Sequence, residues 1–174
     1  RDGSVACYPL AENEHANGIL AVSRAPYRDA SLQRAAERNH GRLFRALGYV
    51  GVLCVEYFVE RGRLVANEMA PRVHNSGHWS IEGAETSQFE NHVRAVAGLP
   101  LGSTSTRGHA VMVNVIGRKP RAAAILAQPG LHWHDYGKTP RPGRKLGHVT
   151  CVTASRARRD RVARQLRRQL KSEP

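Results

Sequence analysis

Two glutamates, Glu56 and Glu68, are the residues whose type and spacing most directly suggest chemistry. They lie on two apolar, β-prone segments separated by the turn-forming run Arg61–Arg63, a pattern that predicts an antiparallel hairpin. A hairpin folded about Gly62 places Glu56 directly opposite Glu68, whereas a shift of one residue would place Asn67 there. Two carboxylates opposed across strands repel each other, and an unpaired carboxylate among apolar neighbours is costly.

A divalent cation would remove both difficulties at this hairpin. Carboxylates that supply part of its coordination shell leave positions for phosphate oxygens and water, which is the usual arrangement for Mg²⁺. The alternative is an exposed edge hairpin with solvated glutamates, and the spacing alone is compatible with both.

The segment after the hairpin adds groups that phosphoryl or acyl-phosphate chemistry uses. Arg72 follows closely, and a guanidinium beside a metal can neutralise charge that develops on a phosphoryl group. His74, Asn75 and Ser76 then offer an imidazole, an amide and a hydroxyl on a glycine-containing loop.

The histidines of this sequence could instead be ligands of a zinc ion. Glu68, His74 and His78 could form such a site. Further candidates are His132, His134 and His148. A helix is not expected across residues 71–77, which contain proline and glycine, so a spacing of four need not place two histidines on one face.

A second cluster of candidate residues is cationic. Lys138 precedes a Pro-Gly turn, and Arg144 and Lys145 follow it. Cations presented by a rigid turn could bind a phosphate group. A solvated basic loop is the alternative.

The elements that must position these groups follow from apolar periodicity and turn residues. We expect helices over 29–47, 87–98 and from 155 onward, with Asp29, Ser87 and Ser155 as their caps. We expect strands over 5–10, 18–22, 49–59, 64–69, 111–116, 131–134 and 146–152. Residues 12–18 are expected to form a polar turn between the first two strands, and the strand over 49–59 is expected to be buried.

The charge of the 174-residue chain is unevenly distributed. The net charge is +13, with 11 side chains of each sign in residues 1–99 but 16 basic and 3 acidic ones in residues 100–174. Eight of the basic residues lie in 156–171. Nucleic-acid binding through the basic half is therefore a competing function. No aromatic residue follows Tyr136, so this segment has no side chain that could stack on bases. A solvated helix face is the simpler interpretation.

Composition narrows the class of protein. The hydrophobic content of 41% argues against full disorder, and no apolar run approaches the length of a membrane span. Cys7, Cys54 and Cys151 lie far apart, which fits neither a disulfide framework nor a metal motif. We therefore expect a cytoplasmic protein.

The run from Asn67 to Trp79, NEMAPRVHNSGHW, closely resembles the signature of a family of ATP-grasp enzymes, the 5-(carboxyamino)imidazole ribonucleotide synthases. Other segments resemble the same family in the same order along the chain. They are Tyr8–Leu10, His15, Asn17–Leu20, Tyr49–Val52, Glu56, Ser87–Glu90 and Arg141–His148.

The resemblance implies an α+β fold in two parts. Residues 1–98 would be the C-terminal portion of an ATP-grasp domain, and residues 99–174 a small, mostly-β domain with a terminal basic helix. It also implies a ligase that uses ATP, Mg²⁺ and bicarbonate to carboxylate the exocyclic amine of 5-aminoimidazole ribonucleotide in purine biosynthesis. ATP would activate bicarbonate as carboxyphosphate, and the amine would attack that species or the CO₂ it releases.

The resemblance also implies roles by position. Glu56 and Glu68 would be the Mg²⁺ ligands, and Arg72 the catalytic arginine near the transferred phosphoryl group. The ATP-binding residues would be His15, Asn67 and Glu68. The substrate-binding residues would be Arg72, His74, Asn75, Ser76, Lys138, Arg144 and Lys145.

Family members carry an N-terminal domain, a phosphate loop and an adenine-binding strand before the part that this sequence resembles. We therefore expect the C-terminal half of an enzyme, inactive by itself, whose full-length form is a homodimer with no membrane or nucleic-acid partner. A sister ATP-grasp transformylase that uses formate is the remaining alternative, and the run over 72–78 argues against it.

Overall fold

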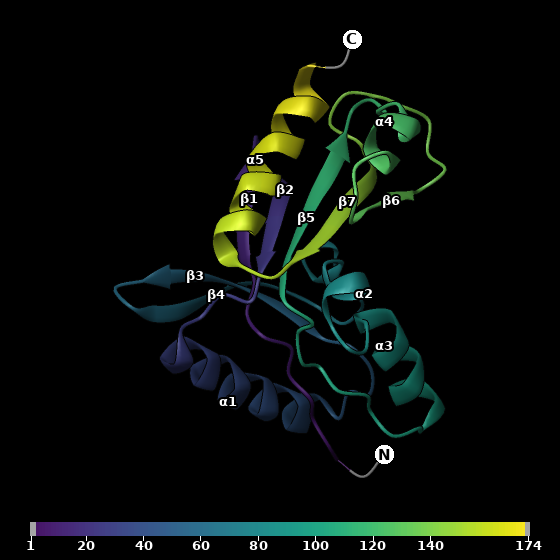
Figure 1. Ribbon diagram of the computed structural model, residues 1–174. Helices are drawn as coiled ribbons and strands as arrows, with labels where there is room; N and C mark the ends of the chain where they lie inside the picture. The colour runs from purple at the N-terminus through teal and green to yellow at the C-terminus, as the bar shows by residue number, and fades with distance from the viewer. Residues whose placement is uncertain (1–2, 173–174) are drawn as a thin grey trace.

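The computed structural model describes residues 3–172, which form a five-stranded antiparallel sheet, a separate two-stranded hairpin and the helices around them (Figure 1). The strands are β1 (Glu12–Ala16), β2 (Ile19–Ala25), β3 (Cys54–Glu60), β4 (Arg63–Ala70), β5 (His109–Ile116), β6 (Leu131–Asp135) and β7 (Lys145–Thr153). The helices are α1 (Ala30–Leu47), α2 (Ser80–Gly83), α3 (Gln88–Ala97), α4 (Ala122–Leu126) and α5 (Arg156–Ser172). A 3₁₀ turn at Asn75–Gly77 precedes α2.

The large sheet has the strand order β1-β2-β5-β7-β6, with β5 at its centre. Val111, Val113 and Val115 of β5 lie in the core cluster beneath α5, which crosses the sheet in Figure 1. Ala110 and Met112 alternate with them and pack in a second cluster that contains Trp79. Because both faces of β5 are covered, its sequence is almost continuously apolar.

Helix α5 joins the sheet through the residues that its periodicity predicts. Leu166 is buried, and Val162 and Leu170 pack partly buried against the same cluster. Two of its arginines also point into ion pairs, because Arg159 bonds to Asp160 and Arg167 contacts Glu14 of β1. Because Arg159 and Asp160 both belong to α5, the helix is held to the sheet by apolar packing and by the pair of Arg167 with Glu14.

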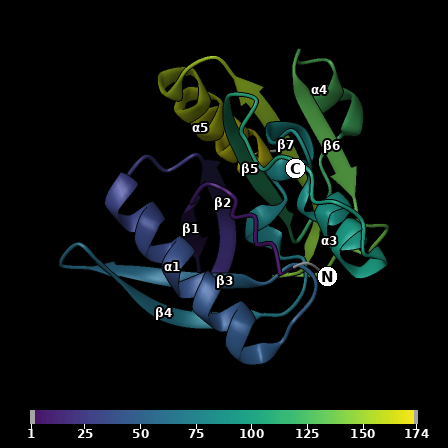
Figure 2. The same cartoon turned by 90° about the horizontal axis from the view of Figure 1, so that it is seen from below.

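The hairpin β3–β4 lies between the sheet and α1, which runs across it in Figure 2. Within residues 3–172, β3 and β4 pair with each other and with no further strand. Phe58 and Val59 are consequently 56% and 54% exposed. The prediction of a buried strand was therefore wrong for the outer half of β3, since burial depends on partners that local sequence does not reveal.

The predicted pairing of Glu56 with Glu68 is confirmed, although the turn and the strand that produce it differ from the prediction. The turn is a two-residue loop of Arg61 and Gly62, both with positive φ, and not a loop centred on Gly62. That loop alone would bring Asn67 opposite Glu56. A β-bulge leaves Asn67 unpaired and restores the pairing of Glu56 with Glu68.

The N-terminal strands differ from the prediction. No strand forms over 5–10, and the predicted polar turn over 12–18 contains β1 instead. A two-residue turn of Asn17 and Gly18, again with positive φ, joins β1 to β2. β1 is polar because it is an edge strand of the sheet, and three of its five residues are exposed. The short helix α4 was not predicted either.

The predicted helix starts are confirmed. The Asp29 carboxylate accepts hydrogen bonds from two backbone N–H groups of α1, and the Ser87 hydroxyl accepts one from Glu90. The Glu90 carboxylate pairs with Arg94. The Ser155 hydroxyl caps α5 in the same way as Ser87 caps α3.

The sheet takes strands from both sides of the predicted boundary at 98/99, because β2 is hydrogen-bonded to β5. The division into 1–98 and 99–174 stays a prediction. No described helix combines the length and the apolar character needed to span a membrane.

Three histidine rings pack where the sheet meets the segment before α3. His148 of β7 stacks on His134 with ring centroids 4.4 Å apart and lies 5.0 Å from His78. Burial lowers the pKa of His78 to about 4 and that of His148 to about 3, with smaller contributions from the neighbouring rings. Both rings are therefore neutral at physiological pH.

Acidification should destabilise the fold through these rings. Their pKa in the unfolded chain is near 6.5, so between that pH and their folded values the unfolded state binds more protons. The contribution of these rings to the free energy of unfolding is complete above about pH 7. Below that pH the free energy of unfolding decreases, by up to about 1.4 kcal/mol per pH unit for each ring. Urea unfolding between about pH 7 and pH 5 measures this slope.

Two substitutions separate the buried rings from general acid sensitivity. His148→Gln should remove a substantial part of the slope, and the rest should remain because the pKa values of His78 and His74 are also lowered. His132→Gln, at an exposed position on β6, should leave it unchanged. An unchanged slope in His148→Gln would refute the assignment to the buried histidines.

Candidate active site

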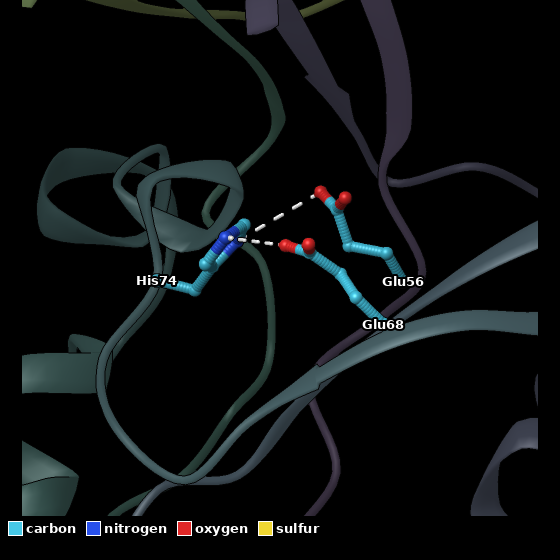
Figure 3. A group of neighbouring side chains, drawn as sticks. All are labelled: Glu56, Glu68 and His74. Atoms are coloured by element: carbon cyan, nitrogen blue, oxygen red, sulfur yellow. Dashed lines mark ion pairs between the residues drawn. The ribbon is translucent and has the colours of Figure 1, made fainter.

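The opposed glutamates and His74 form one cluster of side chains (Figure 3). Glu56 comes from β3, Glu68 from β4, and His74 from the loop that follows β4. His74 Nδ1 lies 3.9 Å from Glu56 Oε1, and His74 Nε2 lies 3.6 Å from Glu68 Oε1. One possible ligand atom from each residue lies within 4.8 Å of the others.

The two carboxylates fit a divalent cation. Glu56 Oε1 is buried and has no hydrogen-bond partner among the described residues, so a carboxylate oxygen points into the cluster without a hydrogen bond. The opposing Glu68 is more accessible, with 58% of its side chain exposed. A hard cation such as Mg²⁺ binds carboxylate oxygens and leaves other coordination positions to water or phosphate.

His74 presents a proton to this pair. Its Nδ1 accepts a hydrogen bond from the backbone N–H of Ser76 at 3.3 Å and lies 2.8 Å from the Ser76 hydroxyl oxygen. The hydrogen bond that Nδ1 accepts from Ser76 assigns the ring proton to Nε2, on the side of Glu68, and burial lowers the pKa of His74, which favours this neutral form. This tautomer makes His74 a hydrogen-bond donor at the site.

His78 does not belong to the cluster. Its Nδ1 accepts a hydrogen bond from Gln88, and its ring packs against Phe89 and His148. Among residues 3–172, the group of close metal-ligating atoms contains His74 and the two glutamates. The zinc site of Glu68, His74 and His78 is therefore not formed, and His132, His134 and His148 provide no such group within that range.

Two other predicted substrate residues are engaged inside the protein. The Asn75 amide exchanges hydrogen bonds with Asn114, at 3.0 and 2.6 Å. Ser76 is 8% exposed and lies 3.7 Å from the Cys54 sulfur, in addition to its contact with His74. Both side chains support the loop, and their contact with a substrate stays a prediction.

A cavity of about 1160 Å³ adjoins the acid pair at Glu56. Glu56, His15 and Asn67 all line it. Two of the three residues predicted to bind ATP therefore open onto the same space as the buried glutamate.

The predicted phosphate-binding residues also lie together. Lys138, Arg144 and Lys145 line a pocket of about 560 Å³ with Gly18 and Ile19. Burial lowers the pKa of Lys145, and the carboxylates of Glu56 and Glu68 oppose that change. Lys145 thus lines this pocket and interacts electrostatically with both glutamates.

Arg72 is exposed beside the loop. One of its guanidinium nitrogens donates to the Val73 carbonyl at 3.0 Å. Burial is the largest cause of the lowered pKa of His74, and the positive charge of Arg72 lowers that pKa further. The same charge lowers the pKa of Lys145, which the carboxylates of Glu56 and Glu68 raise. The guanidinium is therefore near the cluster and accessible to a ligand.

Sequence reasoning missed three residues around the site. Arg141 lines the cationic pocket, and Gln88 and Asn114 bond to the loop at 74–78. Asn114 could have been recognised as a lone amide in the apolar run HAVMVNVI. Gln88 lies within the Ser87–Glu90 cap pattern, which assigns a role only to the serine and the glutamate at its two ends.

Comparisons with family models cover most of the chain. Residues 1–89, just over half of it, match the ATP-grasp domain, and residues 110–161 match the phosphoribosylaminoimidazole carboxylase C-terminal domain. These matches confirm the predicted α+β fold with an ATP-grasp portion.

Curated relatives agree with these matches. N5-carboxyaminoimidazole ribonucleotide synthase of Pseudomonas aeruginosa is 55% identical over 157 residues, which is 90% of this chain and 43% of the relative. The Escherichia coli K12 enzyme of the same name is 45% identical over 158 residues, 90% of this chain and 44% of the relative. The chain therefore spans less than half the length of these relatives.

Solved structures show the same likeness. N5-carboxyaminoimidazole ribonucleotide synthetase from Thermus thermophilus has a TM-score of 0.93 and 53% identity, over 98% of this chain and 48% of that chain. The Aspergillus clavatus synthase in complex with ADP and 5-aminoimidazole ribonucleotide has a TM-score of 0.87 and 30% identity, over 95% and 47%. The chain belongs to the ATP-grasp family, and its relatives within that family are N5-carboxyaminoimidazole ribonucleotide synthases.

Proposed function

We propose that this chain supplies the metal-binding and substrate-binding side of an N5-carboxyaminoimidazole ribonucleotide synthase. The reaction is the ATP-dependent carboxylation of 5-aminoimidazole ribonucleotide with bicarbonate, which gives N5-carboxyaminoimidazole ribonucleotide, ADP and phosphate in purine biosynthesis. The observation that carries this proposal is the directly opposed pair of Glu56 and Glu68 with His74 beside it. Glu68 and His74 belong to the run 67–79 that resembles the family signature.

The acid pair would hold the metal ion of the reaction. Glu56 and Glu68 are the ligands, since their carboxylates converge and Glu56 Oε1 lacks another partner among the described residues. When bound, Mg²⁺ would neutralise phosphate oxygens of ATP and polarise the transferred phosphoryl group. His15 and Asn67 line the cavity beside this pair and would contact ATP from there.

Arg72 would stabilise charge during phosphoryl transfer. The γ-phosphoryl group leaves ADP and bonds to a bicarbonate oxygen, which gives carboxyphosphate. A guanidinium that is already close to the site can offset the negative charge that builds up on the phosphoryl oxygens. The exocyclic amine then bonds to the carboxyl carbon, directly or after release of CO₂, while phosphate departs and the amine loses a proton.

The cationic pocket would fix the substrate by its 5′-phosphate. Lys138, Arg144 and Lys145 supply the charge, and Arg141 lines the same pocket. Because Lys145 lines this pocket and also interacts with Glu56, Glu68 and His74, a ribonucleotide anchored there would have its base within reach of the acid pair.

The competing functions have weaker support. Arg159 and Arg167 of the basic helix pair with acidic side chains inside the molecule, which reduces the charge offered to a nucleic acid. The named relatives are carboxylating synthases, which favours bicarbonate over formate. The homodimer of the full-length enzyme stays a prediction.

A chimera provides the test of activity. In it, this chain replaces the segment of the Pseudomonas aeruginosa synthase with which it aligns. The chimera should form ADP only when aminoimidazole ribonucleotide and bicarbonate are both present, and the 174-residue chain alone should be inactive. Glu56→Gln and Glu68→Gln should each lower kcat/KM by about 100-fold or more, because each removes a carboxylate that would hold the metal ion, whose positive charge stabilises the transition state.

Glu60→Gln, at the exposed outer end of β3, is the matched control and should keep full activity. Turnover with formate in place of bicarbonate, or full activity in both glutamine variants of the acid pair, would overturn the proposal.

The cationic pocket has its own kinetic signature. Lys138→Gln and Arg144→Gln should each raise the KM for aminoimidazole ribonucleotide by about tenfold, with a smaller effect on kcat and none on the KM for ATP, because binding of a remote phosphate is lost. Arg63→Gln on the hairpin is the control. A rise in the KM for ATP alone would assign the pocket to the other substrate.

A further inference from the structure

We propose that Gln88 and Asn114 are positioning residues, which hold the loop at 74–78 from two sides and so fix His74 beside the acid pair. The inference rests on the proposed function of that site. Neither residue belongs to the predicted ligand or substrate set, and both are buried, at 4% and 5% exposed.

Gln88, the first residue of α3, uses its whole amide on the loop. Its Oε1 accepts a hydrogen bond from the backbone N–H of His74 at 3.0 Å. Its Nε2 donates to the His74 carbonyl and to His78 Nδ1, each at 2.8 Å. A backbone N–H can only donate and a carbonyl can only accept, so His74 itself dictates the orientation of the amide.

The loop backbone also packs directly against this amide. A Cβ atom built at Gly77 would lie 2.6 Å from Gln88 Oε1, so only glycine allows the approach. The Ser80 hydroxyl donates to the Gly77 carbonyl at 2.6 Å and accepts from the backbone N–H of Gln88 at 3.0 Å. The start of α3 and the loop are thus one closely packed unit.

Asn114 holds the loop from the central strand of the large sheet. Its Nδ2 donates to the Leu20 carbonyl at 2.8 Å, which fixes the orientation of the amide. Its two polar atoms then pair with the amide of Asn75. The residue next to His74 is therefore tied to β5, while His74 itself is tied to α3.

These contacts set the position of the His74 ring. The Nε2 atom lies 3.6 Å from Glu68 because the backbone on which the ring stands is held on both sides. If either amide is lost, buried backbone or side-chain groups lose their partners and the loop must shift to satisfy them. Supporting contacts of this kind typically change the activity of a site by about 10- to 100-fold.

The first experiment uses the 174-residue chain and needs no substrate. Histidine-labelled protein is compared by NMR with Gln88→Met and Asn114→Leu, which nearly preserve volume but remove the hydrogen bonds. In the unsubstituted chain, His78 should carry its proton on Nε2, and the His74 ring should contact the Glu68 side chain. Gln88→Met should mix the His78 tautomers, and both variants should weaken the His74 contact. Leu166→Ala, in the core cluster under α5, controls for general destabilisation and should change neither signal.

The second experiment measures kinetics in the chimera. Gln88→Met and Asn114→Leu should each lower kcat by about 10- to 100-fold and change the KM for ATP by less than about threefold, whereas Leu166→Ala should retain kcat at temperatures where it is folded. Unchanged histidine signals in the two amide variants would overturn the inference, and so would unchanged kcat in an active chimera. An inactive unsubstituted chimera would instead count against the proposed function, and the NMR comparison would still decide the positioning role.

Discussion

Two like charges held opposite each other on a short hairpin constrain the rest of this site. Glu56 and Glu68 face each other because the bulge at Asn67 resets the register that the Arg61-Gly62 turn would otherwise impose. Their repulsion and the unpartnered Glu56 oxygen are tolerable only where positive charge or proton donors are near. The chain brings such groups from separate segments, since Arg72 and His74 follow β4 and Lys145 begins β7.

The large sheet gives this convergence its rigidity. β5 is covered on both faces and carries Asn114, and β7 beside it carries Lys145 and His148. Helix α3 contributes Gln88 from the opposite side of the loop. Residues that are far apart in the sequence therefore meet at 74–78, where a short loop joins the acid pair to the sheet. The inner end of the hairpin meets the loop, through Cys54 beside Ser76 and through the two glutamates beside His74.

Local patterns predicted the parts of the fold that local physics determines. Helix starts at Asp29 and Ser87 were correct because a cap needs only its own first turn. The pairing of Glu56 with Glu68 was also correct, but through two compensating deviations, a shorter turn and a bulge, which alternation of residues does not encode. The burial of β3 was wrong because it depends on distant partners. Gln88 and Asn114 were missed for a similar reason, since they act through contacts 14 and 39 residues away. The resemblance of residues 67–79 indicated the family, whereas the role of each site residue is still a proposal.

Anomalous diffraction from crystals soaked in Mn²⁺, which substitutes for Mg²⁺ and can be located directly, tests the central claim most closely. We expect a single strong anomalous peak between the carboxylates of Glu56 and Glu68, with the His74 ring adjacent and not ligated through Nε2. An acid pair without a peak at saturating Mn²⁺, or a peak at His78, His134 and His148 instead, would contradict the account.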